Sequence, residues 1–318
     1  MPVLYSPFVS AINPHAADVE RETIIWAGSH DLIRSADVRR FYKLQYGILM
    51  GRAYPHACRD SLQVIADWNT WLFLLDDQCD EAGIGKQPQA LARLHHGFLE
   101  ILHGSAPGAQ ATPAAYALAD LRRRLVQLAQ PGWLDSFIRQ VERYFAANIW
   151  ESTNRLQRKM PTSAEYFRHR PWTGGLDMYF HFIALAQRKP ALYMGSYALK
   201  RLAQHANNVV CWSNDIFSLE KEVRSGDVHN LVLILQHESG LALQPAVDLV
   251  AARHNQEIRS FLDLESSVPS DIDARWFVDG LRFWMRANMD WSAATLRYRP
   301  SVEQAAAAPV YHSTLGSH

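Results

Sequence analysis

Two clusters of oxygen-bearing side chains have the types and the spacing that a hard divalent cation requires. The first is Leu74–Glu81, which follows an apolar run and contains Asp76, Asp77 and Asp80. If this segment is helical, Asp76 and Asp80 lie four residues apart on one face, where like charges repel. Magnesium commonly takes one or two protein carboxylates, with waters or ligand phosphates in its other positions. The cluster therefore indicates a missing cation, although a solvated helix end would show the same residues.

The second cluster lies well over a hundred residues downstream. Asn214, Ser218 and Glu222 recur every four residues, so that an amide, a hydroxyl and a carboxylate follow one face of a helix on successive turns. Three oxygen donors in a row form a second candidate site for a hard cation. Polar residues at this spacing usually form a wet surface stripe, but the preceding segment, Asn207–Trp212, is typical of a buried helix. This context favours a cavity or a partner over open solvent.

Four ordered motifs resemble those of bacterial class I terpene synthases. Residues 76–80, Asp-Asp-Gln-Cys-Asp, resemble the aspartate-rich DDxxD motif, and residues 214–222 match the NSE triad at every expected position. Residues 170–174, Arg-Pro-Trp-Thr-Gly, are similar to the diphosphate-sensor segment, and Arg297-Tyr298 resembles the RY pair near the C-terminus. Single short motifs are weak signals, but four in order at familial spacing are specific. From its first predicted helix to residue 299, the chain is identified as a member of this family.

The resemblance implies a centre that binds three Mg²⁺ ions and a prenyl diphosphate. Metals and fixed cationic donors would neutralise the charge that develops as the C–O bond to diphosphate breaks. The implied metal ligands are Asp76, Asp80, Asn214, Ser218 and Glu222, with Glu81 open as an alternative to Asp80. The residues that the resemblance marks as catalytic are Asp76, Arg170, Thr173 and Gly174.

Donors to the diphosphate are expected from several segments. The resemblance implies Arg170, Lys221, Arg297 and Tyr298, and the two arginines suit bidentate phosphate contacts. Asp77 points about 100° away from Asp76 on a helix, so we expect it to pair with an arginine, either Arg170 or Arg297. Asp215 also lies off the triad face and is not assigned to the site.

The segment after Arg170 is expected to interrupt a helix. Pro171 and the pair Gly174-Gly175 break the helical pattern there. We interpret the break as a switch in which Arg170 senses the diphosphate and the backbone at Thr173–Gly175 moves toward the substrate. A plain loop between two helices is the alternative.

A carbocation must be kept from water in an apolar cavity, and aromatic faces can stabilise it there by about 2 kcal/mol or more. Phe73 and Phe180 are candidate substrate-binding residues, and Trp284 and Trp291 are further candidates because they precede the Arg297-Tyr298 pair. Aromatic residues at helical spacing are more often core.

The function implied is cyclisation of a linear prenyl diphosphate, most simply farnesyl diphosphate, to a sesquiterpene hydrocarbon or alcohol with release of diphosphate. The enzyme would be a carbon–oxygen lyase. A diterpene cyclase acting on geranylgeranyl diphosphate is the alternative substrate reading. A chain-elongating prenyltransferase would carry a second aspartate-rich motif, and Asn214-Asp215 with Ser218 at that position favours cyclisation. The alternative to an enzyme is a helical protein that binds a metal or a ligand without turnover.

Composition excludes several other partners. The 318 residues include 32 basic and 32 acidic side chains, so no net charge favours nucleic acid or an anionic membrane. Three cysteines, Cys58, Cys79 and Cys211, form no disulfide framework or zinc-type spacing, which indicates a reducing, cytoplasmic setting. We see no secretory signal and no apolar run long enough to span a bilayer. The family often forms loose dimers, so a homodimer is compatible with the resemblance.

Helical periodicity dominates the chain from Asp18 onward, and no strand alternation or interior linker appears. We therefore expect one all-α domain, the class I terpene synthase bundle with a central apolar cavity. Its division would be an N-terminal arm (1–17), a catalytic domain (18–299) and a C-terminal tail or lid (300–318). The expected helices lie near residues 38–48, 60–81, 89–102, 113–128, 133–158, 163–170, 176–188, 190–223, 241–264 and 274–297.

Overall fold

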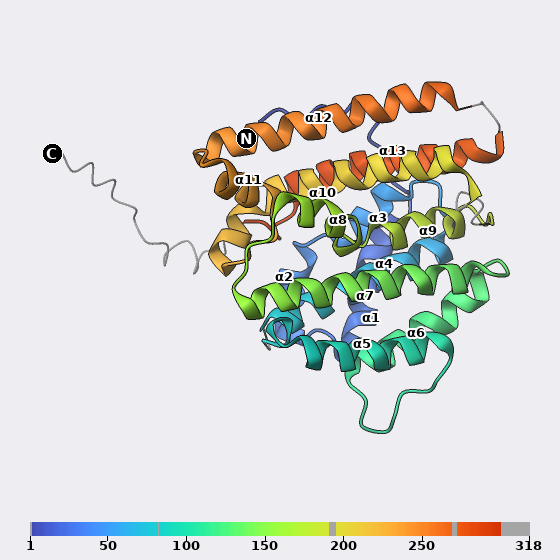
Figure 1. Ribbon diagram of the computed structural model, residues 1–318. Coiled ribbons are helices and arrows are strands. Elements are labelled where there is room, and N and C mark those ends of the chain that lie inside the picture. The colour runs from blue at the N-terminus through green and yellow to red at the C-terminus, as the bar shows by residue number, and fades with distance from the viewer. Residues whose placement is uncertain (1, 82, 191–194, 269–271, 300–318) are drawn as a thin grey trace.

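The computed structural model describes residues 2–81, 83–190, 195–268 and 272–299, without the side chains of residues 78–81 and 272–274. Every regular element in these ranges is a helix, which confirms the expected all-α class (Figure 1). The expected tail, 300–318, lies outside the described residues. The helices are α1 (Ala16–Ser29), α2 (Val38–Tyr42), α3 (Tyr46–Ala53), α4 (Arg59–Glu81), α5 (Pro88–His103), α6 (Pro113–Leu128), α7 (Trp133–Gln157), α8 (Ser163–Thr173), α9 (Leu176–Ala186), α10 (Tyr197–Ser225), α11 (Leu231–Ser239), α12 (Leu243–Ser267) and α13 (Ile272–Ala294), with 3-10 turns at Ser35–Asp37 and Ile84–Lys86.

Local capping explains why several helices start where the sequence indicates. The hydroxyl of Thr112 accepts a hydrogen bond from the backbone of Ala115 and starts α6. Thr162 and Glu165 form a complete capping box at α8, because each side chain bonds the backbone of the other residue. These starts depend on neighbouring residues alone, so sequence predicts them.

The single helix expected near residues 38–48 is wrong, because the structure divides it into α2 and α3. Gln45 adopts a left-handed conformation, with φ of 58°, between the two helices. The carbonyl of Leu44 accepts hydrogen bonds from Trp291 Nε1 at 2.8 Å and Thr295 Oγ1 at 2.9 Å. The Leu44 carbonyl, which could have continued α2, thus accepts hydrogen bonds from α13 and from the residue that follows α13.

The helix break expected at Pro171 lies three residues later. α8 continues through Pro171 to Thr173, since the amide of Gly174 still donates to the carbonyl of Arg170 at 3.0 Å. A proline inside a helix removes its own donor and crowds the carbonyl four residues earlier, yet the helix continues past Pro171. The chain then turns at Gly175, whose φ of 68° suits glycine.

The sequence did not predict α11, because none of the expected helices covers its residues.

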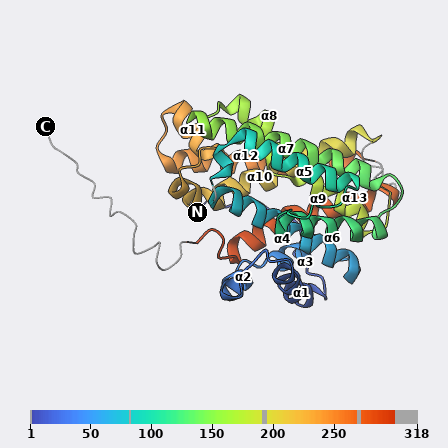
Figure 2. The ribbon, with the colours of Figure 1, turned by 90° about the horizontal axis from the view of Figure 1, so that it is seen from below.

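The long helices α7, α10, α12 and α13 run roughly along one direction, and α10 packs against both α12 and α13 (Figures 1 and 2). An aromatic cluster joins α4, α7 and α9: Trp68 and Phe137 rings lie 4.8 Å apart, and Phe137 and Phe182 rings lie 4.9 Å apart. Buried aromatic pairs of this kind stabilise a core beyond the area that they bury. The cluster therefore provides a rigid base for the helices that carry the candidate site.

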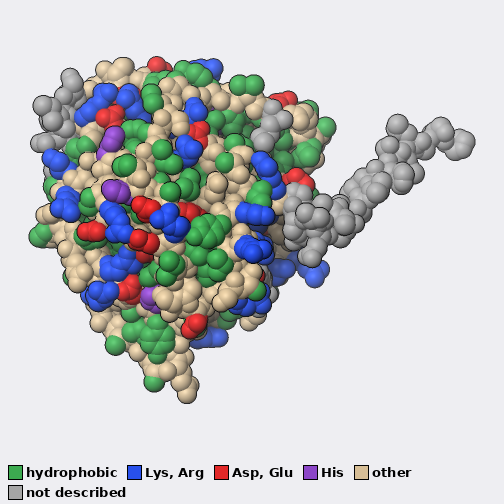
Figure 3. All heavy atoms as spheres, turned by 180° about the vertical axis from the view of Figure 1, so that it is seen from behind, with side chains coloured by type: hydrophobic (Ala, Val, Ile, Leu, Met, Phe, Trp, Pro, Cys, Tyr) green, Lys and Arg blue, Asp and Glu red, His purple; other side chains and the backbone are tan. Residues whose placement is uncertain are grey.

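Basic and acidic side chains are interspersed on the face shown in Figure 3, in keeping with the balanced composition. Among the helices of the described ranges, none is both long and apolar enough to cross a membrane.

Candidate active site

One cavity of about 240 Å³ receives side chains from both predicted clusters. Asp76 reaches it from α4, and Asn214, Ser218 and Glu222 reach it from α10. The other predicted site residues that line the cavity are Arg170, Thr173, Gly174, Lys221, Arg297, Tyr298 and Phe73. The side chains of Asp80 and Glu81 lie outside the described residues, so the choice between them stays a prediction. Segments more than a hundred residues apart thus form a single pocket.

The triad face of α10 is held by hydrogen bonds. Asn214 Nδ2 donates to Tyr298 Oη at 2.7 Å, and its Oδ1 accepts from Arg170 Nη2 at 3.0 Å. The hydroxyl of Ser218 donates to the Asn214 carbonyl at 2.8 Å, which leaves lone pairs on its oxygen. Burial raises the pKa of Glu222 to about 7, and the neighbouring charge of Asp215 adds to the rise.

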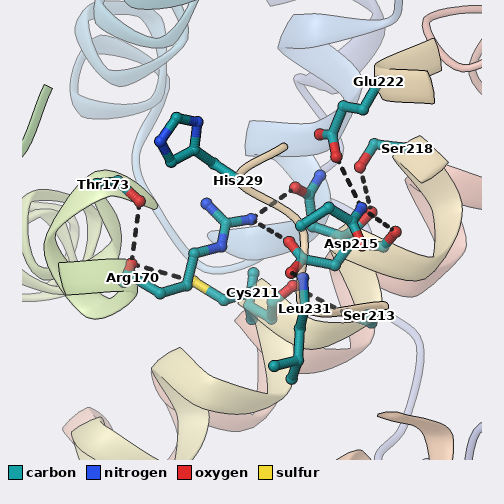
Figure 4. Close-up of polar contacts among 12 residues, drawn as sticks. Arg170, Thr173, Cys211, Ser213, Asp215, Ser218, Glu222, His229 and Leu231 are labelled. Carbon is teal, nitrogen blue, oxygen red and sulfur yellow. Dashed lines mark hydrogen bonds and ion pairs between the residues drawn. The ribbon is translucent and has the colours of Figure 1, made fainter. Parts of the chain in front are cut away.

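Arg170 is anchored by a residue that sequence analysis left out of the site. Its Nη2 lies 2.6 Å from Asp215 Oδ1, and Asp215 is completely buried (Figure 4). The other oxygen of Asp215 accepts hydrogen bonds from Tyr166 Oη and from the backbone of Leu231. Because the arginine lies 45 residues upstream, only the fold reveals that Asp215 orients it.

The ion pair expected for Asp77 forms with Arg297, one of the two arginines considered. Arg297 Nη1 and Nη2 lie 3.0 and 3.1 Å from the two carboxylate oxygens. Burial alone would raise the pKa of Asp77, but the Arg297 guanidinium lowers it below its usual value. Lys221 Nζ lies 3.8 Å from the same carboxylate, and Arg297 Nη2 lies 3.8 Å from Asp76. Asp77 therefore pairs with two of the predicted phosphate donors, both of which line the cavity.

The predicted role of Phe180 in binding substrate stays a prediction, and the described cavity is lined by its neighbour instead. Phe180 is completely buried and does not line the cavity, whereas its neighbour Tyr179 does. The first turn of α9 begins after Gly175, and this register decides which ring faces inward. Trp284 and Trp291 do line the cavity, as expected, and so does Phe73, which stacks on Tyr46 with ring centres 4.6 Å apart.

The end of α8 lies close against α10. A Cβ atom on Gly174 would lie 2.5 Å from Cys211 Sγ, so only glycine fits there without a shift. Thr173 and Gly174 both line the cavity. Gly174, which lies between α8 and α9, thus places backbone without a side chain on the cavity wall beside Cys211.

A second polar group on the cavity wall was not found from sequence. Arg155 Nη2 lies 2.7 Å from Asp227 Oδ2, and His229 Nδ1 lies 2.7 Å from the other oxygen of Asp227. Asn154 Nδ2 lies 3.3 Å from His229 Nε2. Burial would raise the pKa of Asp227, but the hydrogen bond from His229 and the charge of Arg155 lower it strongly. This group ties the loop after α10 to α7.

The donor set fits a hard divalent cation. No group of three or more His, Cys, Asp or Glu side chains that could hold a metal occurs in the described part of the chain. A metal on α10 would therefore use the amide, hydroxyl and carboxylate oxygens of Asn214, Ser218 and Glu222, which are ligands that magnesium accepts. Glu222 is a partly buried carboxylate beside a second acid, and a bound cation would offset that repulsion.

Comparisons with known proteins agree with this geometry. The model for the metal-binding C-terminal region of terpene synthase family 2 matches residues 67–260. The (+)-T-muurolol synthase of Roseiflexus castenholzii, described as cyclizing (2E,6E)-farnesyl diphosphate, is 42% identical over 306 residues, with 94% of each chain covered. Germacrene A synthase of Nostoc punctiforme is 33% identical, with 93% of this chain and 94% of the relative covered. The crystal structure of a-eudesmol synthase shares the fold at 23% identity, with a TM-score of 0.83 over 92% of this chain and 99% of that chain.

Proposed function

Since the chain belongs to terpene synthase family 2, we propose that it ionises farnesyl diphosphate and cyclises the carbocation to a sesquiterpene hydrocarbon or alcohol. The observation that carries this proposal is the shared cavity, into which Asp76 projects from one helix and Asn214, Ser218 and Glu222 from another. The description of the Roseiflexus castenholzii relative supports farnesyl diphosphate as the substrate. The reaction is that of a carbon–oxygen lyase, with diphosphate as the leaving group.

The metals are proposed to be three Mg²⁺ ions. The residues that would hold them are Asp76, Asp80, Asn214, Ser218 and Glu222. When bound, these ions supply Lewis-acid stabilisation of the negative charge on the departing diphosphate.

The chain itself binds and orients the diphosphate. Arg170, Lys221, Arg297 and Tyr298 line the cavity and are proposed donors to the diphosphate oxygens. Arg170 is held in place by buried Asp215, and Arg297 by Asp77. Two guanidinium groups fixed in this way need little reorganisation when charge develops. The backbone at Thr173 and Gly174 is proposed to move toward the substrate when Arg170 engages the diphosphate.

The apolar part of the cavity excludes water from the carbocation. Phe73, Tyr179, Trp284 and Trp291 line it, and aromatic faces attract cations at close range. The ring of Phe73 already has the Arg297 guanidinium carbon 4.4 Å from its centre. These rings are proposed to guide folding of the isoprenoid chain.

Incubation with farnesyl diphosphate and Mg²⁺, followed by headspace gas chromatography, tests the function. We expect a volatile C15 product that disappears when a chelator removes the metal. Product from geranylgeranyl diphosphate alone would instead support the diterpene alternative. Silence toward prenyl diphosphates of every chain length would support a binding module without turnover.

Three further assignments belong to the proposal. The catalytic domain is proposed to span residues 18–299, with an arm before it and a tail after it. The cytoplasmic setting rests on three cysteines without a disulfide framework. A homodimer is proposed from the family resemblance, and light scattering after size-exclusion chromatography would test it.

A further inference from the structure

The loop between α10 and α11 returns to the triad face of α10. Its last residue, Asn230, is completely buried. Asn230 Nδ2 donates to Glu222 Oε2 at 2.7 Å and to the Asp215 carbonyl at 2.7 Å. Its Oδ1 accepts from the backbone of Val232 at 2.9 Å and caps α11. Both protons and the oxygen of this amide are therefore in use.

The contact with Glu222 bears directly on metal binding. Glu222 lies in the last turns of α10, and its side chain has three rotatable bonds, so an unsupported carboxylate there would sample several orientations. A hydrogen bond from Asn230 to Oε2 restricts the orientation of the carboxylate and still leaves lone pairs for a cation. Groups that orient metal ligands in this way affect metal affinity strongly.

The same segment also fixes the acid that holds Arg170. The backbone amide of Leu231, next to Asn230, donates to Asp215 Oδ2 at 2.8 Å (Figure 4). Asn230 and Leu231 thus contact two carboxylates that lie two turns apart on the same side of α10. One serves the candidate metal site and the other serves the candidate diphosphate sensor.

We infer that Asn230 is a positioning residue, which orients Glu222 for the metal and links that ligand to the Asp215–Arg170 pair. This inference deepens the proposed function and rests on its assignment of Glu222 as a ligand. The competing explanation is that Asn230 only caps α11. The two explanations differ in what happens when the cap is kept and the amide donor is removed.

The variant Asn230→Ser makes that separation. Serine is also a good capping residue, but its hydroxyl is too short to take the place of the amide on Glu222. Asn13 supplies a matched control, because it is buried and makes the same kinds of contact far from the cavity. Its Nδ2 donates to the carbonyls of Tyr54 and Ala57, and its Oδ1 accepts from the backbone of His15.

The measurement is the Mg²⁺ concentration at half-saturation, by calorimetry or by thermal shift, in the presence of inorganic diphosphate and without any isoprenoid. We expect Asn230→Ser to raise it by about tenfold or more, as for other residues that orient metal ligands. Asn13→Ser should lower the melting temperature and leave the Mg²⁺ midpoint at the wild-type value. If Asn230→Ser does not fold, Asn230→Thr, which also keeps a capping oxygen, takes its place.

An unchanged Mg²⁺ midpoint in a folded Asn230→Ser or Asn230→Thr variant would overturn the inference. So would an equal shift in Asn13→Ser, since that would reflect general loosening. Because no isoprenoid is present, these results are independent of turnover. Silence toward every prenyl diphosphate would overturn the proposed function and leave the Mg²⁺ result standing.

Discussion

The two walls of the cavity differ in how completely they are assembled. On α10, Asn214, Ser218 and Glu222 each have a short hydrogen bond to a neighbour, and Asp215 beneath them is fully buried. On α4, the side chain of Asp76 is 53% exposed, and its closest approach to Arg297 is 3.8 Å. The α10 wall is therefore organised before any ligand arrives, whereas on the α4 wall about half of the Asp76 side chain is exposed. The comparison predicts that substitutions on the cavity side of α10 affect both stability and activity, and that substitution of Asp76 affects activity alone.

The largest effect is expected from Glu222→Gln, which keeps the shape of the side chain and removes its charge. Turnover should fall roughly 10³-fold, because an anionic metal ligand becomes a neutral amide and the metal that stabilises the departing diphosphate is held less tightly. The helical circular dichroism should remain. Steady-state kinetics on folded protein would measure the change.

Glu220→Gln is the control, since Glu220 lies on the same helix and is 69% exposed. It should retain wild-type turnover. Equal losses in the two variants would show that charge anywhere on this helix matters and would remove the distinction between its faces.

Asp215→Asn should destabilise the fold by about 3–5 kcal/mol, because it removes one partner of a buried ion pair and leaves the Arg170 charge unpaired. Denaturant unfolding would measure the loss. Affinity for inorganic diphosphate should fall as well, since Arg170 loses its anchor. A fully stable variant would contradict the view that the α10 wall is assembled in advance.

Asp76→Asn should lower turnover roughly 10²-fold, as expected when a metal carboxylate becomes a neutral amide. Its free energy of unfolding should stay within about 0.5 kcal/mol of wild type, because an exposed carboxylate contributes little to stability. Turnover and denaturant unfolding, measured on the same preparations of Asp76→Asn and wild type, would test both expectations. A large loss of stability would mean that α4 is as tightly organised as α10.

The smallest expected effect is a loss of fold stability at acid pH that is caused by one buried histidine outside the two walls. His181 on α9 is buried, and burial lowers the pKa of its imidazole to about 4. This low pKa keeps the ring neutral at pH 7. With the proton on Nδ1, which donates to the Asp177 carbonyl, Nε2 accepts from the Ser136 hydroxyl. The unfolded chain binds the proton near pH 6.5, so stability present above that pH is lost as the pH falls toward 4. The loss should be on the order of 2 kcal/mol by pH 5.

Unfolding measured at pH 7 and at pH 5 in wild type and in His181→Gln would isolate this contribution. The variant should lose less stability than wild type between the two values. Parallel losses would mean that other groups cause the acid sensitivity.

Sequence was sufficient where the determinants are local. The range Pro113–Leu128 of α6 was predicted correctly because Thr112 and Pro113 define its start. The spacing of Asn214, Ser218 and Glu222 likewise fixes their shared face, because a helix repeats every 3.6 residues. The regular helical spacing of residues was therefore enough to predict both the all-α class and the face of the candidate metal site.

Sequence did not predict features that depend on contacts with a distant segment of the chain. The separation of α2 from α3 depends on donors of Trp291 and Thr295, about 250 residues away. The roles of Asp215 and Asn230 depend on contacts that only the folded chain makes. The choice of Tyr179 over Phe180 depends on the register of α9 after Gly175, and periodicity alone does not fix that register.

The most direct test of the shared metal site is a crystal structure with Mn²⁺ in place of Mg²⁺ and with inorganic diphosphate. Anomalous scattering would then locate the ions. We predict ions bound to Asp76 and ions bound to Asn214, Ser218 and Glu222, all around one diphosphate, at oxygen distances of about 2.0–2.2 Å. Ions on one wall only, or a diphosphate bound outside this cavity, would contradict the account.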